Sequence, residues 1–413
     1  MPATVRFDPS QPGFLENPYP FYQQLRETDP VHWEAEPQGR WVLTRYADVA
    51  AALRDPRLLK AGAEPLLNDV PRAVRKEVAP LERTIEQQID SINPPAHTRL
   101  RRLMNRGFTP EMVAARRPQI EQVIDELLDP LVPAGQMDLI ADFSYPLPAL
   151  VIMDMLGIPR ADREQVRRWS NDYAALMGHG GMGEDPGNAA RQANQSMLEF
   201  SAYLRGIVAE HRQASRDDLL SALLAVEEQG DVLSEDELIA NCRLLLIAGH
   251  ETTTNLIGNG MLALLRHPDQ LAALRDDPTL LDTAVEELLR YDGPVQFTFR
   301  WAGQDFELAG KPIQKGQMVV IVVAAANHDP AQFPNPSQLD LRRRPNEHHA
   351  FGFGIHFCLG APLARLEGQL ALSALLRRLP GVRLGDQPPV RQPNPVLRGL
   401  ASLPLRWTPP PAS

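Results

Sequence analysis

The sequence predicts a mainly α-helical protein with a small β region. Residues 234–267 form the strongest helical pattern, with apolar side chains on nearly every face, as in a helix buried inside a large domain. Two further helical patterns, at about 163–176 and 189–214, flank a glycine-rich segment. Extended signals are few and short. They lie at Val31–Glu34, 41–44, Phe306–Leu308 and 318–322.

Two prolines start a helix near residue 96. Pro94 and Pro95 have the fixed backbone geometry that suits a first helical turn. His97 and Arg101 follow, four residues apart, and therefore share one helical face. This pair suits an anionic ligand, whereas an isolated histidine or arginine is more often solvated on the surface.

The glycine-rich segment at 177–187 separates two of the helical patterns. Its composition predicts a loop inside the domain. Gly180, Gly181 and Gly183 are typical of a lid that opens widely, which favours a bulky or variable substrate.

The long helix carries polar residues that disagree with its surroundings. Ser234 and Glu237 form a capping box at its start, and Pro268 ends it. Near its middle, residues 248–253 read Ala-Gly-His-Glu-Thr-Thr. Glycine costs roughly 1 kcal/mol relative to alanine in a helix interior, and threonine hydroxyls compete for backbone carbonyls. Such a local conflict indicates a functional site; the alternative is a helix kink without chemistry.

Glu287 and Arg290 lie three residues apart on another predicted helix, beside apolar Val285 and Leu288. This spacing makes them neighbours on one face. An ordinary surface ion pair would show the same pattern, so the pair alone decides nothing.

A ten-residue string at 351–360, Phe-Gly-Phe-Gly-Ile-His-Phe-Cys-Leu-Gly, contains one of only two cysteines in the chain. Its glycines allow a tight turn and a close backbone approach, and Phe351 could shield the sulfur. A helix opening at about Ala361 would point its positive end toward an anionic ligand. A lone cysteine is usually a buried small hydrophobe, but the whole string indicates a haem-thiolate site at Cys358.

This string resembles the cysteine-loop signature of the cytochrome P450 family. The resemblance spans about residue 14 to the C-terminus and implies a triangular α-helical prism with a small β region built largely from the N-terminal hairpins. It implies one domain over 1–413, with a β-rich part at about 14–60, later short strands, and a helical haem-binding core at about 90–380.

The resemblance also implies roles for individual residues. Glu251 and Thr252 are similar to the family's acid-alcohol pair, which delivers protons beside a groove where O2 binds. The resemblance implies that Glu287 and Arg290 form a structural ion pair, which a later arginine joins. Alignment of the residues before the cysteine loop favours Arg343 as this arginine, although Arg342 and Arg344 flank it. Cys358 is the implied iron ligand. The other implied contacts to haem b are His97, Arg101, Arg300, His356, Ala248, Gly249, Phe351 and Gly352.

The implied reaction inserts one atom of O2 into a C–H or C=C bond of a hydrophobic substrate, and the other atom leaves as water. The implied substrate contacts are mostly apolar, with Gln296 as an orienting donor. They are Ile85, Ile89, Ile92, Leu176, Met177, Leu245, Ala248, Val295, Gln296 and Phe297. A terpenoid, fatty acyl, steroid or macrolide skeleton would suit them, and nothing in the sequence ranks these classes.

Composition narrows the expected partners. The formal net charge of −10 is spread along the chain, which argues against a nucleic-acid binder. The N-terminus has no apolar segment that would target a membrane, so we expect a soluble, cytoplasmic, monomeric protein. Cys242 lies in the apolar long helix, and we expect a core role for it. With no flavin or iron–sulfur module in the chain, electrons would come from NAD(P)H through a separate reductase and ferredoxin.

Two alternatives stay open. A peroxygenase would use the same thiolate haem with H2O2, but relatives of that kind generally lack the acid-alcohol pair. A haem sensor without enzymatic activity could also use a cysteine ligand, yet it would need neither a dioxygen groove nor a lid.

Overall fold

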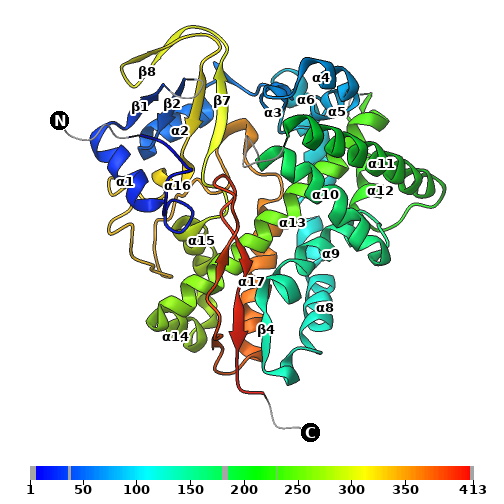
Figure 1. Cartoon of the computed structure of the whole chain (residues 1–413). Helices are drawn as coiled ribbons and strands as arrows, with labels where there is room; N and C mark the ends of the chain where they lie inside the picture. Colours follow the sequence, from blue (N-terminus) through cyan, green and yellow to red (C-terminus); the bar gives the residue numbers. More distant parts are fainter. Residues whose placement is uncertain (1–5, 36–38, 179–184, 229, 410–413) are drawn as a thin grey trace. The chain divides into compact units, whose positions relative to one another are not determined.

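The computed structural model of this protein describes residues 6–35, 39–178, 185–228 and 230–409. Figure 1 shows the elements of the chain coloured along the sequence. Contacts divide the chain into two compact units. Unit 1 comprises Met1–Leu59, Arg117–Leu147 and Glu251–Ser413, and unit 2 comprises Lys60–Arg116 and Pro148–His250. Helix dominates the described chain, so the mainly α prediction is confirmed. The assignment of 1–413 to one domain stays a prediction, and the expected lid glycines Gly180, Gly181 and Gly183 lie outside the described residues.

Unit 1 contains most of the strands and the helices next to the cysteine loop. Its helices are α1 (Tyr19–Thr28), α2 (Tyr46–Arg54), α8 (Arg117–Leu128), α14 (Pro268–Asp276), α15 (Leu281–Asp292), α16 (Val323–Ala326) and α17 (Ala361–Arg378). Its strands are β1 (Val31–Glu34), β2 (Arg40–Leu43), β3 (Leu58–Leu59), β4 (Gln136–Asp138), β7 (Thr298–Ala302), β8 (Phe306–Leu308), β9 (Lys311–Ile313), β10 (Met318–Ile321), β11 (Arg383–Leu384), β12 (Val390–Arg391), β13 (Leu400–Ser402) and β14 (Pro404–Arg406).

The main sheet joins segments that are far apart in the sequence. Its strand order is β1-β2-β10-β7-β3, and β10 runs parallel to β2 with Val320 opposite Val42. The expectation that the β region comes largely from the N-terminal hairpins is therefore only partly right, because β7 and β10 supply two of the five strands. The short C-terminal strands β11 to β14 also escaped prediction, since two- and three-residue strands carry no readable period.

Unit 2 is almost entirely helical. Its elements are α3 (Glu64–Leu67), α4 (Arg72–Glu77), α5 (Ala79–Ile85), α6 (Ala96–Gly107), α7 (Pro110–Ala115), α10 (Arg163–Gly178), α11 (Pro186–Gln213), α12 (Leu219–Leu224), β5 (Glu227–Glu228) and β6 (Asp231–Val232). Helix α9 (Pro146–Met155) crosses the boundary near its start. The two helices predicted around the glycine-rich segment are α10 and α11, which pack through the stacked rings of Trp169 and Phe200, 4.9 Å apart.

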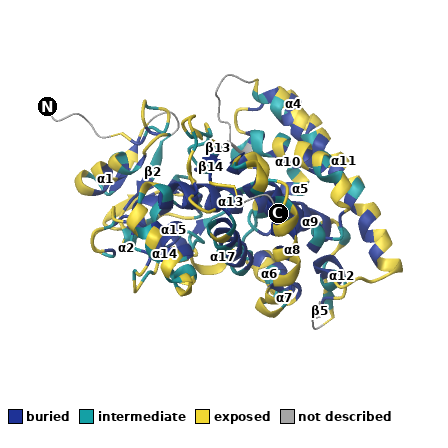
Figure 2. Cartoon of the chain, turned by 90° about the horizontal axis from the view of Figure 1, so that it is seen from below, coloured by how far each residue is buried: buried dark blue, intermediate teal, exposed yellow. Residues whose placement is uncertain are grey.

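The long helix α13 (Glu235–Arg266) begins in unit 2 and ends in unit 1. The predicted capping box is confirmed: Glu237 N donates to Ser234 Oγ (3.2 Å) and Ser234 N donates to Glu237 Oε2 (2.9 Å). Within unit 1, α13 packs against α15 and α17, and Leu256 belongs to the same buried cluster as Leu288 and Leu372. Figure 2 shows α13 and α17 as mostly buried. A polar side chain on this part of α13 is therefore shielded from bulk water.

In the part of the chain that the structure describes, no helix is long and apolar enough to cross a membrane.

Candidate active site

The cysteine loop of unit 1 is a tight turn held by backbone hydrogen bonds. Cys358 N donates to Phe351 O (2.9 Å), which closes the loop on itself. Gly352 and Gly354 have φ values of +71° and +74°, which other residues adopt only with strain. A Cβ at Gly354 would also lie 2.8 Å from Leu53 O, so α2 approaches the loop too closely for a side chain there. These glycines allow the tight turn that precedes Cys358.

The loop exposes side chains that are normally buried. Cys358 is exposed, and 52% of Ile355, 37% of Phe357 and 36% of Phe353 are exposed. Free cysteine is among the most buried residue types, and a group of exposed apolar side chains marks a surface that binds another apolar body. An exposed thiol on a loop that also exposes apolar side chains fits the flat, largely apolar face of a haem whose iron takes a cysteine ligand.

The side chain of Phe351 is fixed by neighbouring charges. The Arg365 guanidinium lies over its ring, 4.5 Å from the centroid. Arg365 also donates to both carboxylate oxygens of Glu286, at 2.7 and 2.9 Å. Burial alone would raise the pKa of Glu286, but hydrogen bonds from His348 and Arg365 outweigh it and lower the pKa to about 2. The ring therefore stacks on a cation that stays paired at every ordinary pH.

Glu287 on α15 anchors the segment that leads to the loop. Arg290 donates to its two oxygens at 2.7 and 2.8 Å, and both side chains are fully buried. Of the three candidate arginines, Arg343 reaches Glu287, at 3.1 and 3.2 Å from Nε. The carbonyls of Asn327 and Pro336 accept from Arg290 Nη1. One buried carboxylate thus binds two guanidiniums, and these also donate to backbone carbonyls of the segment before the loop.

The motif at 248–253 straddles the boundary of the two units. Ala248 and Gly249 belong to unit 2, where Ala248 is exposed, while Glu251 and Thr252 belong to unit 1. Burial raises the pKa of Glu251, so it holds a proton at higher pH than an ordinary glutamate. His250, which lies between Gly249 and Glu251 in the sequence, is buried, and burial lowers its pKa. Its Nδ1 lies 2.6 Å from Leu246 O.

Sequence analysis missed one acidic residue in this region. Glu367 on α17 is 1% exposed, and its Oε1 has no hydrogen-bond partner among the described residues. Burial raises its pKa to about 8, and a hydrogen bond with Thr253 opposes that shift only partly. It is therefore a neutral carboxylic acid at pH 7. The signal was available, because an acid stands among Leu363, Leu366 and Leu370 on an apolar helical face.

The four residues expected at the haem propionates come from different elements. In unit 2, His97 and Arg101 lie one turn apart on α6; His97 is buried, and burial followed by the charge of Arg101 lowers its pKa. In unit 1, Arg300 lies on β7 with Nη1 donating to Phe299 O (2.8 Å), and His356 lies in the cysteine loop. His97 is therefore neutral at pH 7 and suited to a hydrogen bond, while the arginines carry charge.

Most of the expected substrate contacts in unit 2 are buried or half-buried apolar residues. Ile85, Ile89 and Leu176 are buried, whereas Ile92 and Leu245 are half-buried. Ile89 N donates to Asn241 Oδ1 (3.0 Å), which ties this segment to α13. The side chain of Met177 lies outside the described residues.

The residues of unit 1 that were expected to contact a substrate are less available for this role. Gln296 was expected to orient a substrate, but its Nε2 donates to Gly293 O (2.9 Å) and its Oε1 accepts from Tyr22 (3.2 Å). Phe297 packs in an apolar cluster, 5.5 Å from the ring of Phe7. Val295 is half-buried and forms an isolated β-bridge with Leu397. Gln296 and Phe297 thus have protein partners of their own.

Comparisons with known proteins show the family to which this chain belongs. The family model for cytochrome P450 matches residues 70–405. The cytochrome P450 monooxygenase PikC of Streptomyces venezuelae is 42% identical over 405 residues, which cover 95% of this chain and 92% of PikC. The vitamin D(3) 25-hydroxylase of Pseudonocardia autotrophica is 41% identical over 412 residues, 98% of each chain.

The solved structure of P450BioI in complex with hexadec-9Z-enoic acid ligated acyl carrier protein aligns with a TM-score of 0.88 at 37% identity, covering 96% of this chain and all of that one. The chain therefore belongs to the cytochrome P450 family and is an O2-dependent, haem-iron monooxygenase.

Proposed function

We propose that this protein holds haem b and hydroxylates or epoxidises a hydrophobic organic substrate, with two electrons supplied by a ferredoxin and a ferredoxin reductase on separate chains. The observation that carries the proposal is the exposed thiol of Cys358 on a glycine-shaped loop.

Cys358 is the proposed iron ligand, and haem b, when bound, supplies the O2 chemistry. The backbone bond between Cys358 N and Phe351 O holds the sulfur in position, and the Phe351 ring shields it. Gly352 turns the chain at positive φ. His97, Arg101, Arg300 and His356 are the proposed partners of the haem propionates, because anionic groups that are partly buried need cationic or donor partners. Ala248 and Gly249 supply the part of α13 where a haem and O2 can approach the backbone closely.

Glu251 and Thr252 are proposed to deliver protons to O2. Burial raises the pKa of Glu251 above that of an ordinary glutamate, which moves it toward the range where a general acid is most effective. Thr252, its neighbour on the helix, presents a hydroxyl that passes a proton on without carrying charge. With the hydroxyl of Thr252 between the acid and O2, protons are transferred one at a time and the carboxylic acid does not protonate O2 directly.

The proposed substrate is a large hydrophobic molecule. Ile85, Ile89, Ile92, Leu176, Met177 and Leu245 stay the candidate contacts, since apolar lining with few polar groups is typical of such sites. Relatives fit this expectation: structures of CYP109E1 are described in complex with corticosterone and with testosterone, at TM-scores of 0.84 and 0.82. P450BioI is described with a fatty acyl group on a carrier protein.

The test compares two sources of oxidant. Purified protein loaded with haem should convert a bound substrate in air with reduced ferredoxin and reductase. Anaerobic incubation with H2O2 should give far less product per unit time. Faster turnover with H2O2 than with ferredoxin would assign a peroxygenase instead.

The proton relay has its own test. In Thr252→Ala, substrate binding and oxygen consumption should persist, while a larger share of electron pairs should end as H2O2 instead of product, because water replaces the metering hydroxyl. Glu251→Gln should slow turnover with less peroxide, since it removes the acid and keeps the hydroxyl. Unchanged coupling in both variants would show that these residues are not the relay.

A further inference from the structure

One pocket of unit 1 contains none of the residues proposed to bind haem or substrate. It has a volume of about 490 Å³, which is within the usual range for sites that bind small molecules. Its walls come from α1, from the ends of α13 and α15, and from residues 328–337 and 391–398. All of these segments belong to unit 1. The pocket is therefore large enough for a small organic ligand.

Arg26 on α1 lines this pocket and is a buried cation without an anionic partner of its own. It is 8% exposed, and its one hydrogen bond among the described residues runs from Nη1 to Ala325 O (3.0 Å). Burial lowers its pKa, and the more distant charges of Asp329 and Glu27 oppose this shift only in part. A guanidinium has five N–H donors, and burial of an unpaired charge is unfavourable. The remaining donors of Arg26 are therefore available to an anion in the pocket.

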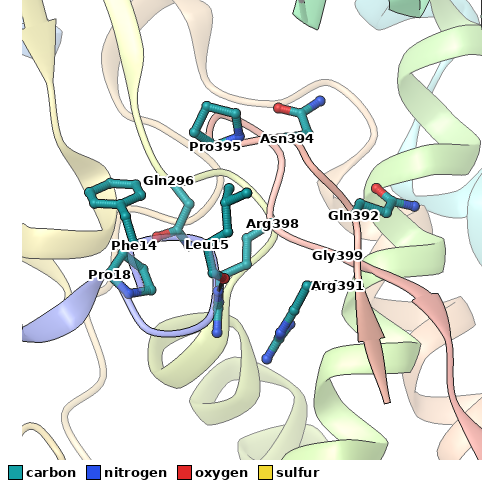
Figure 3. A pocket seen from close by; sticks show the side chains of 10 residues that line it. All are labelled: Phe14, Leu15, Pro18, Gln296, Arg391, Gln392, Asn394, Pro395, Arg398 and Gly399. Atoms are coloured by element: carbon teal, nitrogen blue, oxygen red, sulfur yellow. Dashed lines mark hydrogen bonds between the residues drawn. The ribbon is translucent and has the colours of Figure 1, made fainter. Parts of the chain in front are cut away.

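Arg398, which lines the same pocket, shows how a buried arginine is satisfied in this region. It is 7% exposed. Its Nε donates to Asp292 Oδ1 (2.6 Å), and its two Nη atoms donate to Leu15 O (2.6 Å) and Glu16 O (2.9 Å). Figure 3 shows Arg398 beside Leu15, where it also lines a second pocket of only about 10 Å³. Burial at this pocket therefore does not by itself deprive an arginine of partners.

A second cation without an ion pair lies at the same pocket. Arg266 is the last residue of α13, is exposed, and makes no ion pair with the described residues. The carboxylates in the lining do not neutralise it. Asp292 already accepts from Arg398, while Glu16 and Glu27 are exposed to solvent. The pocket thus offers two guanidiniums to an anion, although the chain as a whole has a formal net charge of −10.

Flat rings form much of the apolar lining. Tyr19 stacks on His328, with ring centroids 4.2 Å apart and an interplanar angle of 27°, and the ring of Tyr291 lies 6.0 Å from that of His328. Burial lowers the pKa of His328 to about 3, so its ring is neutral at pH 7. Pro20 and Pro330 add two rings that have no N–H donor. Walls of this kind favour a flat, apolar ring in the ligand.

We propose that this pocket binds a small aromatic carboxylate. The two oxygens of the carboxylate match the planar donors of the Arg26 guanidinium, and Arg266 supplies a second positive charge. The aromatic ring of the ligand packs against the rings of Tyr19, Tyr291 and the two prolines. The site is separate from the proposed substrate site, and the inference does not depend on the proposed function.

Isothermal titration calorimetry with 1-naphthoate tests the binding. The haem-loaded protein is first saturated with an azole that ligates the haem iron, so that the substrate space is already filled. One naphthoate should bind per chain. The alcohol 1-naphthalenemethanol has the same ring without the charge and should bind at least about tenfold more weakly, because hydrogen bonds to charged groups are the stronger ones. No binding of naphthoate, or equal affinities for the acid and the alcohol, would overturn the proposal.

The haem spectrum shows which site the probe occupies. It should stay that of the azole complex throughout the titration. Displacement of the azole by naphthoate would place the probe in the substrate site and would also overturn the proposal.

Two substitutions locate the site. Arg26→Gln should weaken naphthoate binding by about tenfold or more, since it removes the charged partner of the carboxylate. Arg266→Gln should weaken it by roughly threefold, because a solvent-exposed charge contributes less. Arg266 is exposed, so this variant should keep the wild-type Tm and decides the question even if Arg26→Gln fails to fold.

Arg45→Gln is the matched control. Arg45 is an exposed arginine of the same unit that does not line the pocket, and its removal changes the net charge equally. Naphthoate affinity should stay at the wild-type value in this variant. Equal affinities in wild type and Arg266→Gln, or equal losses in Arg266→Gln and Arg45→Gln, would reject this pocket as the binding site.

Discussion

The two cysteines show how environment divides one residue type into two roles. Cys242 is 2% exposed on α13, and burial raises its pKa to about 12, so its thiol is an inert apolar group. Its predicted core position is confirmed. Cys358 is exposed on the glycine loop, where a thiolate can meet a metal.

We expect Cys358→Ser to lose the optical signature of thiolate ligation while the fold survives. Serine places a hydroxyl oxygen near the position of the sulfur. This hydroxyl is not deprotonated readily enough to replace a thiolate on iron. The measurement is the absorption spectrum of the reduced carbon monoxide complex. Cys242→Ala is the matched control and should keep the signature. A normal thiolate spectrum in Cys358→Ser would exclude this residue as the ligand.

The raised pKa of Glu367 predicts how its contribution to the free energy of unfolding changes with pH. The folded protein holds the proton up to a pKa of about 8, whereas the ordinary value is 4.5. Stability from this group is therefore complete below about pH 4.5 and is lost as pH rises toward 8. Relative to wild type, Glu367→Gln should gain free energy of unfolding across this interval, by on the order of 1–3 kcal/mol.

Urea unfolding of both proteins at pH 5 and pH 8 measures the difference. Glu347→Gln, at an exposed position of the same unit, should show no such trend. A difference between Glu367→Gln and wild type that stays constant with pH would contradict the buried, protonated state.

The sequence was sufficient to predict a role for residues such as Cys358 and its neighbouring glycines. It was not sufficient to predict which polar side chains form hydrogen bonds with one another. Cys358 and the glycines beside it stand out because few chemistries need them together. Gln296 looked like a substrate donor, but its hydrogen bonds to Gly293 and Tyr22 join segments distant in sequence. The buried amide of Asn255, which has no hydrogen-bond partner among the described residues, escaped notice for the same reason, since hydrogen-bond partners are visible only in the structure.

At the scale of elements, the segment before the cysteine loop depends on hydrogen bonds from arginine instead of regular structure. Arg343 donates from Nη1 to Pro334 O (2.9 Å) as well as to Glu287 from Nε. A loop held in this way stays ordered because one planar guanidinium reaches several acceptors at fixed angles. The network therefore positions the loop that carries Cys358.

Arg343→Lys should lower the free energy of unfolding by about 2–4 kcal/mol, because an ammonium cannot span these acceptors and leaves the buried Glu287 short of a partner. Haem content after purification should fall as well. Arg342→Lys, at an exposed neighbouring position, should change stability by less than about 0.5 kcal/mol. Equal effects of the two substitutions would show that the network is not specific to Arg343.

Elements with local signals were predictable, and those made by distant pairing were not. The capping box and Pro268 bound α13 within one residue of its expected ends. The parallel pairing of β2 with β10 has no local signal, because it joins strands separated by most of the chain. Short strands such as β12 form only because a partner is present.

At the scale of the whole molecule, charge bears on how electrons arrive. The chain has a formal net charge of −10, yet arginines cluster on α6 and near the cysteine loop. Arg101, Arg102, Arg106 and Arg365 are the arginines there that could attract an acidic ferredoxin. The structure weakens the case for Arg365, since Glu286 accepts two hydrogen bonds from it and cancels its charge.

Arg102 and Arg106 on α6 are the other candidates for this role. Both are exposed, and Arg102 lies at 4.0 Å from Asp231, the outer limit of an ion pair. Positive charge there would steer an acidic partner toward unit 2 and speed its encounter more than it tightens binding.

Charge reversal at Arg102 or Arg106 should therefore slow reduction of the haem-loaded protein by ferredoxin, by roughly tenfold at low ionic strength. The effect should shrink as salt rises, because the screening length falls to about 10 Å at 0.1 M. Stopped-flow reduction at several salt concentrations measures it. Lys76→Glu, an exposed reversal on α4 of the same unit, changes the net charge equally and should have a much smaller effect. Equal slowing by all three reversals would mean that only the total charge matters, and equal slowing at every ionic strength would remove α6 as the docking surface.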